Sequence, residues 1–385
     1  MKNLLPPNWQ FNQSQLNGIN TDGKWLLPPL VDLCVVIANN EHATIDSESK
    51  SAYQNGFLYV CTPPTTSQPL DNGSLIDDIR HKASKNGVHL SVIGALTAHL
   101  QGEKLANLAS LKPKTIAVSN GRAGFGNDDV LLRALEYANT FDVKVFFYPD
   151  EPSLSKNGVA HDGYVASFHG LAGIPWIAET VALAKQLLIV EETGVSAHFS
   201  CLSCKSSVEL VRTAKKKGLP VTADVAMHQL HLTDDAIDGY NTLAFVYPPL
   251  RSQTDQRALI EGLQDGTIDA ICSHHEPVSM TAKLAPFAES TAGISNFDTF
   301  ASLAVKLVTD GILTHEQLIQ KICINPAKIA GIEMIYHQKG GAILIDPTQQ
   351  WTVNDKTLLS MGKNTPFINQ TLVGRVESVF LHKNE

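Results

Sequence analysis

Side chains that could bind a metal ion stand at the ends of several short apolar runs in this sequence. Cys34, His198 and His274 each lie in or just after such a run, and His275 follows directly. Catalytic zinc takes at least three protein ligands of the histidine, cysteine or carboxylate type and keeps one position open. Cys34, His198 and His274 therefore form one candidate metal site, whose chemistry would be the activation of a water molecule.

Three other motifs favour a structural interpretation. The Cys-x-x-Cys pair of Cys201–Cys204 lacks the second pair of a zinc site, so we expect packed thiols. The glycine-rich segment Gly121–Gly126 lacks the Lys-Ser/Thr ending of a phosphate-binding loop, and we expect a flexible loop. His228 and His231 match no ligand pattern, and we expect them to have structural roles.

The elements that would position these side chains alternate along the chain. Short β-rich runs are each followed by a polar, helix-forming stretch. Eight strands are predicted, at Leu30–Val35, Phe57–Cys61, Val88–Ile93, Thr115–Val118, Val143–Tyr148, Val195–Phe199, Val221–Val225 and Ala270–Cys272. Helical patterns such as Ser207–Lys217 and Asp255–Gln264 lie between them. This α/β pattern predicts a parallel sheet covered by helices, and eight such units predict a (β/α)8 TIM barrel with its chemistry at the carboxyl ends of the strands.

The two ends of the chain depart from this alternation. The first 25 residues are rich in Asn, Gln and Pro, and the last part contains the β-rich runs Ala342–Pro347 and Gly374–Leu381. We therefore predict an N-terminal β-rich segment over 1–25, a barrel over 26–335 and a C-terminal β-rich segment over 336–385. The two end segments are expected to pack together as a small appendage.

Composition narrows the class of protein. The chain has 385 residues, 43% hydrophobic and 18% charged, as in a globular protein with a large core. A net charge of −8 argues against a nucleic-acid surface. No segment reads as a membrane helix or secretory signal, so we expect a cytoplasmic protein without membrane or nucleic-acid partners. Six cysteines are too few for a disulfide scaffold.

Several framework segments occur in an order that is specific to one enzyme family. They are Pro29–Leu33, Gly218–Val225, Tyr247–Arg251, Ala258–Leu263, Asp265–Ile271 and Gly362–Phe367. Together they resemble the dihydroorotases of the amidohydrolase superfamily, from about residue 28 to the C-terminus. The resemblance implies a metal-centred (β/α)8 barrel with a small β-sandwich, in which one or two zinc ions serve the hydrolysis or closure of a cyclic amide.

The first-strand metal segment of that family is altered in this chain. The family has Asp-x-His-x-His, followed two residues later by an arginine that binds substrate. Here Cys34 and Val36 stand at the histidine positions and Ala38 at the arginine position. The resemblance therefore implies that two metal ligands and the anion-binding group are missing.

Most of the other functional positions of the family also carry residues that differ from the family's ligands and substrate-binding groups. The resemblance places Pro64 and Tyr247 at substrate-binding asparagines, Asn120 at the bridging ligand, Tyr148 at a histidine ligand, His274 at the proton-shuttling aspartate and Val278 at a substrate position. His198 alone still matches a ligand, and one imidazole cannot hold zinc against water. We therefore expect no catalytic residues, no bound metal and no cofactor.

The resemblance also suggests a role and a partner. In some bacteria, similar proteins are non-catalytic dihydroorotase homologues that bind the catalytic chain of aspartate carbamoyltransferase and are needed for its active assembly. We expect this chain to be such a pseudoenzyme in pyrimidine biosynthesis, a homodimer within a larger hetero-oligomer. The alternative is an active cyclic amidohydrolase with the rearranged ligands Cys34, His198 and His274. A ligand-binding sensor is disfavoured by Ala38.

Overall fold

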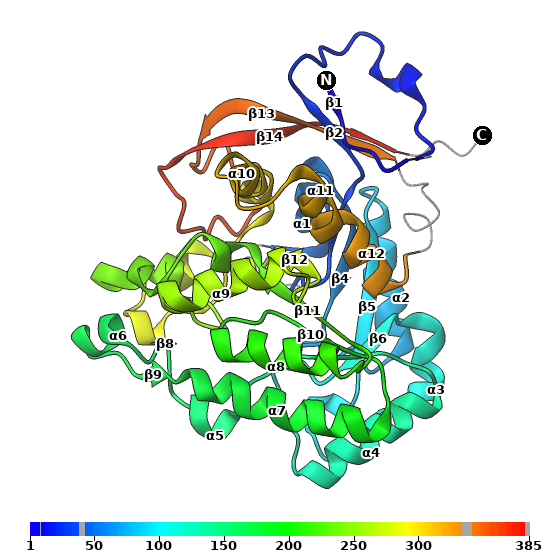
Figure 1. Cartoon of the computed structure of the whole chain (residues 1–385), viewed down its shortest axis with the longest axis vertical. Coiled ribbons are helices and arrows are strands. Elements are labelled where there is room, and N and C mark those ends of the chain that lie inside the picture. The colour runs from blue at the N-terminus through cyan, green and yellow to red at the C-terminus, as the bar shows by residue number, and fades with distance from the viewer. Residues whose placement is uncertain (8, 38–42, 333–340, 382–385) are drawn as a thin grey trace.

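A parallel barrel forms the centre of the molecule (Figure 1). The computed structural model describes residues 1–7, 9–37, 43–332 and 341–381. Eight strands lie in the order β12-β11-β10-β7-β6-β5-β4-β3. Their bounds are β3 (Leu30–Asp32), β4 (Phe57–Thr62), β5 (His89–Ala95), β6 (Ala117–Ser119), β7 (Val145–Phe147), β10 (Ala197–Phe199), β11 (Val221–Ala226) and β12 (Ala270–Cys272). The predicted TIM barrel is confirmed, and each predicted strand forms within three residues of its expected ends.

The barrel closes between its first and last strands. Val35, just after β3, forms a parallel bridge with His275, just after β12. The amide of Ser273 donates to Oδ1 of Asp32 at 3.1 Å, so a side chain of β3 completes the seam. Closure brings the carboxyl ends of all eight strands to one rim, where a barrel of this type carries its chemistry.

Helices cover the outside of the barrel, as Figure 1 shows. The longer ones are α1 (Ile45–Gln54), α2 (Gly73–Ser84), α4 (Asp128–Thr140), α7 (Trp176–Thr193), α8 (Lys205–Lys216), α9 (Gln253–Gln264) and α10 (Phe297–Thr309). The shorter ones are α3 (Leu108–Leu111), α5 (Pro152–Ser155), α6 (Tyr164–Phe168), α11 (His315–Ile319) and α12 (Asn325–Ala330). Local signals fix their ends: Ser252 caps α9 by accepting from the amide of Asp255, and Gly194 ends α7 with a φ of 69°.

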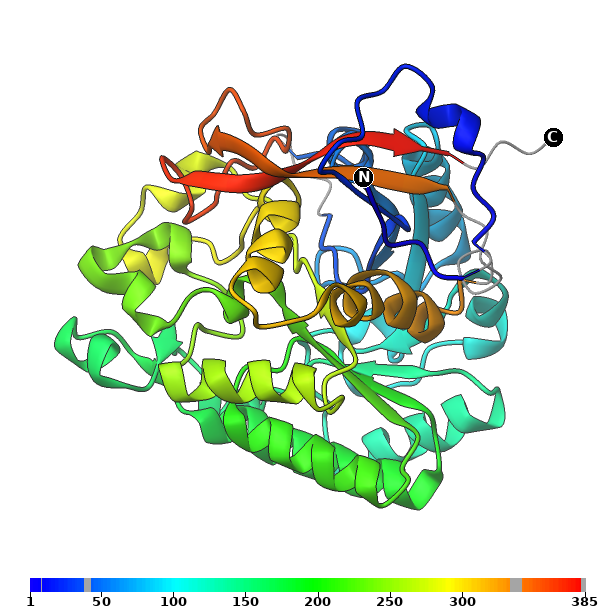
Figure 2. The same cartoon turned by 45° about the horizontal axis from the view of Figure 1, so that its top comes forward.

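The two chain ends form one mixed sheet beside the barrel, in which β1 and β2 are parallel and the other pairs antiparallel. Strands β1 (Lys2–Asn3), β2 (Trp25–Leu27), β13 (Ala342–Thr352) and β14 (Thr371–Phe380) pair in that order. Figures 1 and 2 show β13 and β14 passing over α10, which packs against β14. The predicted β-rich appendage from both termini is therefore present. A third sheet, of two strands, joins β8 (Ala160–His161) to β9 (Gly173–Ile174).

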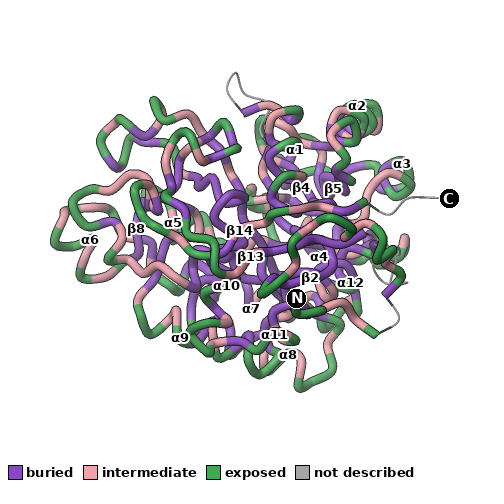
Figure 3. Tube along the Cα trace, turned by 90° about the horizontal axis from the view of Figure 1, so that it is seen from above, coloured by how far each residue is buried: buried purple, intermediate pink, exposed green. Residues whose placement is uncertain are grey.

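The barrel strands are buried on both faces. All six residues of β4 are buried, as a parallel strand between side chains inside and helices outside requires. Seen from above, the buried stretches run through the middle of the molecule and the exposed ones follow its outline (Figure 3). Among the described residues, no helix is both long and apolar enough to cross a lipid bilayer.

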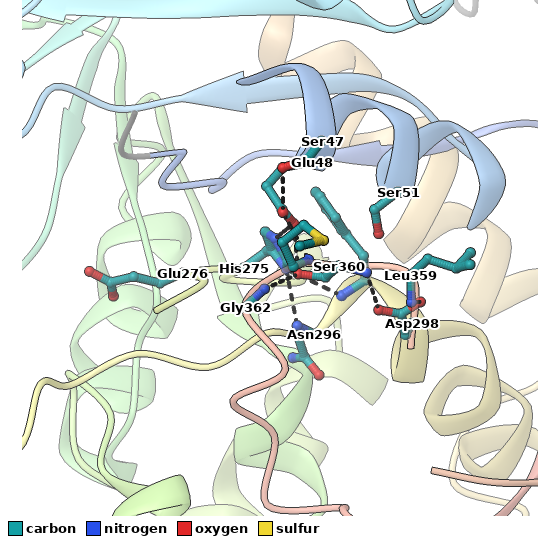
Figure 4. Close-up of polar contacts among 12 residues, drawn as sticks. Ser47, Glu48, Ser51, His275, Glu276, Asn296, Asp298, Leu359, Ser360 and Gly362 are labelled. Atoms are coloured by element: carbon teal, nitrogen blue, oxygen red, sulfur yellow. Dashed lines mark hydrogen bonds and ion pairs between the residues drawn. The ribbon is translucent and has the colours of Figure 1, made fainter. Parts of the chain in front are cut away.

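A buried polar network fastens the segment between β13 and β14 to the barrel rim (Figure 4). The carboxylate of Glu48, on α1, is fully buried and accepts from Nε2 of His275 at 3.0 Å. It also accepts from the hydroxyl of Ser360 at 2.7 Å and the amide of Met361 at 3.1 Å. Burial alone would raise the pKa of Glu48, but the contact with His275 and the other donors hold it below its ordinary value of 4.5.

Candidate functional site

The carboxyl rim of the barrel contains two adjoining cavities. The larger has a volume of about 540 Å³ and the smaller about 340 Å³. Arg122 and Tyr148 line both cavities and so lie at the boundary between them. Cys201 borders the larger cavity and His274 the smaller, which places candidate ligands at the floor of each.

His198, the residue that still matches a ligand position, is held by protein groups on both ring nitrogens. Its side chain is fully buried in β10. The carboxylate of Asp224 accepts from Nε2 at 2.9 Å, and Nδ1 is hydrogen-bonded to the hydroxyl of Thr222 at 2.8 Å. The ring also packs on Phe146, with centroids 4.5 Å apart. In this arrangement His198 has no lone pair directed at a metal ion.

Cys34 lies in a cluster of thiols under the hydroxyl of Tyr148. The side chain of Cys34 is fully buried, and Oη of Tyr148 donates to its sulfur at 3.4 Å. The thiols of Cys201 and Cys272 lower the pKa of Cys34 well below its ordinary value of 9.0, against the opposing effect of burial. Burial and the nearby sulfur charge raise the pKa of Tyr148. Tyr148 therefore serves as a hydrogen-bond donor where the family has an imidazole.

An arginine occupies the centre of the rim. Nη2 of Arg122 lies 3.0 Å from Oε2 of Glu276 and 3.0 Å from Nε2 of His274, and donates to the carbonyl of Tyr247 at 3.3 Å. Because the guanidinium has no acceptor, Nε2 of His274 accepts. Burial opposes the charge of Arg122, but Glu276 raises its pKa. A fixed positive charge thus stands at the mouth of the barrel. Arg122 makes these contacts from the loop Gly121–Gly126.

Of the remaining vestigial positions, three line the cavities. Val36 and Pro64 border the smaller one and Tyr247 the larger. The hydroxyl of Tyr247 donates to the carbonyl of Gly158 at 2.8 Å, so the side chain of Tyr247 is held in the wall of the larger cavity. These side chains give the cavities apolar and aromatic surfaces where the resemblance implies amides and imidazoles.

The other vestigial positions are engaged elsewhere or not described. Nδ2 of Asn120 donates to the carbonyl of Gly124 at 2.8 Å, so the amide supports its own loop. The amide of Val278 donates to Oδ1 of Asn364 at 3.0 Å. Ala38 lies outside the described residues. Neither Asn120 nor Val278 presents a ligand atom to the thiol cluster.

His228 and His231 do not belong to the thiol cluster. The ring of His228, in the turn Met227–Leu230, stacks on His274 with centroids 5.9 Å apart. Burial, and then the neighbouring His274, hold the pKa of His228 well below its ordinary 6.5. Burial likewise lowers the pKa of His231 to about 4. Both rings are therefore neutral at neutral pH.

Two groups of donors come together among the described residues. The ligand atoms of Cys34, Cys201 and His274 all lie within 4.8 Å of one another, and so do those of Cys201, Asp224 and Cys272. His198 is in neither group, so the structure joins Cys34 and His274 to Cys201 instead. The sequence reasoning missed Cys201, Asp224 and Cys272 as neighbours, although each stands in or just after a predicted strand.

The donors do not fit the hydrolytic metal centre that the resemblance implies. Such a centre needs imidazole ligands, a carboxylate for proton transfer and an open position for water. Here His198 is bonded on both nitrogens, Val36 has no donor, and the carboxylate of Asp224 is engaged by His198 and by the amide of Cys201 at 2.7 Å. We therefore derive no hydrolytic step through a metal.

Comparisons with known proteins agree with the barrel fold and with the resemblance to the dihydroorotases. A family model described as Dihydro-orotase-like matches residues 23–207. Proteins named "Dihydroorotase-like protein" from Pseudomonas aeruginosa and Pseudomonas putida are each 41% identical, over 92% and 93% of this chain and 86% of theirs. A protein named "Dihydroorotase" from Trichlorobacter lovleyi is 35% identical over 92% of this chain and 86% of its own length. The solved structure of L-hydantoinase (dihydropyrimidinase) from Arthrobacter aurescens superposes with a TM-score of 0.82 at 20% identity, over 95% of this chain and 86% of that one, which shows the fold.

Proposed function

This chain belongs to the dihydroorotase-like proteins of the amidohydrolase superfamily, and from that premise we propose that it is a non-catalytic member that serves as a structural subunit. The observation that carries the proposal is the state of His198, whose two ring nitrogens are bonded to Asp224 and Thr222. An imidazole in that state holds no metal, and without a metal-bound hydroxide a cyclic amide has no nucleophile at neutral pH.

The framework around the altered site supports a retained structural role. The barrel is complete, and its strand order and seam are intact. Relatives named "Dihydroorotase-like protein" reach 41% identity, whereas those named "Dihydroorotase" reach 35% or 36%. We propose that the fold is kept for assembly, with the catalytic chain of aspartate carbamoyltransferase as partner in pyrimidine biosynthesis. We further propose a homodimer of this chain within that complex.

The outer face of α7 supports a protein partner. Ile177, Val181 and Leu188 are spaced to lie along one side of this helix, and their exposed fractions are 41%, 40% and 66%. A helix that faces only water carries charged or polar residues at such positions. Exposed apolar side chains in a row are typical of a protein interface, and we propose this face as the contact with the transcarbamoylase chain.

We predict no turnover of dihydroorotate or carbamoyl aspartate by the purified protein, with or without added Zn²⁺. The measurement is the absorbance change of dihydroorotate, with the Trichlorobacter lovleyi protein as a positive control. His198→Ala should leave the background rate unchanged. Turnover by the wild-type protein that disappears in His198→Ala would overturn the proposal in favour of the rearranged amidohydrolase.

We predict that this chain forms a stable complex with the transcarbamoylase chain. Light scattering of the two proteins, alone and mixed, should show a new species larger than either. Leu188→Asp should weaken this association at least about tenfold, because it places a charge in an apolar contact. Leu284→Asp is the matched control, since Leu284 is 80% exposed and belongs to another element, directly after the 3-10 helix Met280–Lys283. Absence of a complex, or equal loss in both variants, would contradict the assigned partner or surface.

A further inference from the structure

Three cysteines that are distant in the sequence meet beneath the rim. Cys34 follows β3, Cys201 follows β10 and Cys272 ends β12. Their exposed fractions are 0%, 3% and 0%. The sulfur atoms of Cys201 and Cys272 are 3.8 Å apart, and the sulfur atom of Cys34 lies within 4.8 Å of that of Cys201. The other three cysteines of the chain lie elsewhere, at Cys61, Cys204 and Cys323.

The distance between the sulfur atoms of Cys201 and Cys272 matches a metal thiolate. A tetrahedral zinc ion with Zn–S bonds of about 2.3 Å holds two sulfur atoms about 3.8 Å apart. A trigonal cuprous site has nearly the same spacing, and soft thiolates are preferred ligands of both ions. We propose that Cys34, Cys201 and Cys272 form a closed binding site for one thiophilic d10 cation, either Zn²⁺ with His274 as fourth ligand or Cu⁺ held by the three thiolates alone.

An independent observation at His274 points to a ligand. Its Nδ1 atom is buried and has no hydrogen-bond partner among the described residues, while its ligand atom lies within 4.8 Å of those of Cys34 and Cys201. A buried ring nitrogen without a partner is costly unless something binds it. A zinc ion on Nδ1 would place the ring proton on Nε2. Arg122 would then give up its contact with His274 and keep the one with Glu276.

The surroundings of the sulfur atoms suit a charged metal cluster. Zn²⁺ with three thiolates carries one net negative charge, and the guanidinium of Arg122, which Glu276 keeps at the rim, counters it. Oη of Tyr148 donates to the sulfur of Cys34, and Asp224 fixes the backbone of Cys201 by accepting from its amide at 2.7 Å. Outer contacts of this kind orient metal ligands. The two cavities that border Cys201 and His274 give a metal ion a route in from solvent.

Such a site would be structural and not hydrolytic. When protein side chains supply every ligand, no position remains open for water, as in structural zinc sites. The metal would join strands β3, β10 and β12 at the rim. A structural metal site goes beyond the proposed function and can be tested separately from it. Metal binding without turnover would agree with both the metal site and the non-catalytic role. Turnover would contradict only the non-catalytic role.

The test is metal binding by the reduced full-length chain under anaerobic conditions. Co²⁺, as a spectroscopic substitute for Zn²⁺, and Cu⁺ are titrated separately, and thiolate-to-metal absorption is followed. We expect one equivalent to bind. Cys34→Ser, Cys201→Ser and Cys272→Ser should each weaken binding at least about a hundredfold, more than loss of an outer contact does. Cys61→Ser and Cys323→Ser, which alter buried thiols outside the cluster, are the matched controls and should bind as the wild type does.

Two further measurements separate the ions and guard against misfolded variants. His274→Asn should abolish tight binding of Co²⁺ if zinc is the natural ion and should leave Cu⁺ binding unchanged. X-ray absorption of the zinc-loaded wild-type chain should show three sulfur neighbours at about 2.3 Å. The proposal is overturned if neither ion binds, if the zinc neighbours are only nitrogen and oxygen, if the three cysteine variants bind like the controls, or if the isolated protein contains a Cys201–Cys272 disulfide.

Discussion

Replacement of Glu48 by glutamine should lower the free energy of unfolding by about 2 to 3 kcal/mol, because its buried carboxylate accepts several hydrogen bonds and a hydrogen bond to a charged group contributes about 1.5 to 3 kcal/mol. Glu48 and His275 are both fully buried and lie 3.0 Å apart. Glutamine fills the same space, but its amide accepts at one oxygen where the carboxylate accepts from His275, Ser360 and Met361. Urea denaturation of the wild type and the variant measures the difference.

The matched control is Glu136→Gln on α4. Glu136 pairs with Arg133 at 3.2 Å, but its side chain is 49% exposed, so the change should stay within about 1 kcal/mol. Because Ser360 and Met361 lie between β13 and β14, Glu48→Gln should also expose that segment to proteolysis earlier than the rest of the chain. Equal stability of the two variants would contradict the role assigned to the network in Figure 4.

The sign of the pH dependence follows from the lowered pKa of Glu48. A carboxyl group whose pKa is lower in the folded than in the unfolded chain stabilises the fold above its unfolded pKa. That contribution is lost as the pH falls through the lower, folded value. The stability difference between wild type and Glu48→Gln should therefore be full above pH 4.5, the ordinary value for this group, and should shrink below it.

The barrel could be predicted because its signals are local. Each strand is a short apolar run, and each helix an amphipathic one, so the pattern in a window of ten or so residues decides the element. β4 and β12 formed almost as predicted, and α8 and α9 end within one residue of the ends predicted for their helical patterns. The order of the parallel strands then followed from the alternation itself, because a strand, helix and strand connection places successive strands side by side.

The contacts of the candidate site could not be predicted in the same way, because they join residues far apart in the chain. Arg122 and His274 are separated by 152 positions and Glu48 and Ser360 by 312. The periodicity of the sequence does not indicate which residues so far apart will come into contact. The loop Gly121–Gly126 has the composition of a flexible segment, yet its arginine reaches across the rim to Glu276, because barrel closure brings the ends of β6 and β12 to the same side.

Replacement of Asp224 by alanine should lower the free energy of unfolding by about 3 to 5 kcal/mol, because it leaves buried donors without an acceptor. The carboxylate, fully buried in β11, accepts from Nε2 of His198 at 2.9 Å and from the amide of Cys201 at 2.7 Å. Asp238→Ala is the control: Asp238 also contacts a histidine, His169, but is 76% exposed, and its loss should leave the stability close to that of the wild type.

Asp224→Ala also tests the proposal that the protein has no hydrolytic activity. If the carboxylate holds His198, its removal frees Nε2 inside the barrel, and the gap left by the aspartate lowers stability without creating a metal site, since Val36 and Tyr148 still offer no imidazole. Asp224→Ala should therefore be less stable and remain without turnover when zinc is added. A variant as stable as the wild type would mean that His198 is not held by Asp224, and its ring would then be available to a metal ion after all.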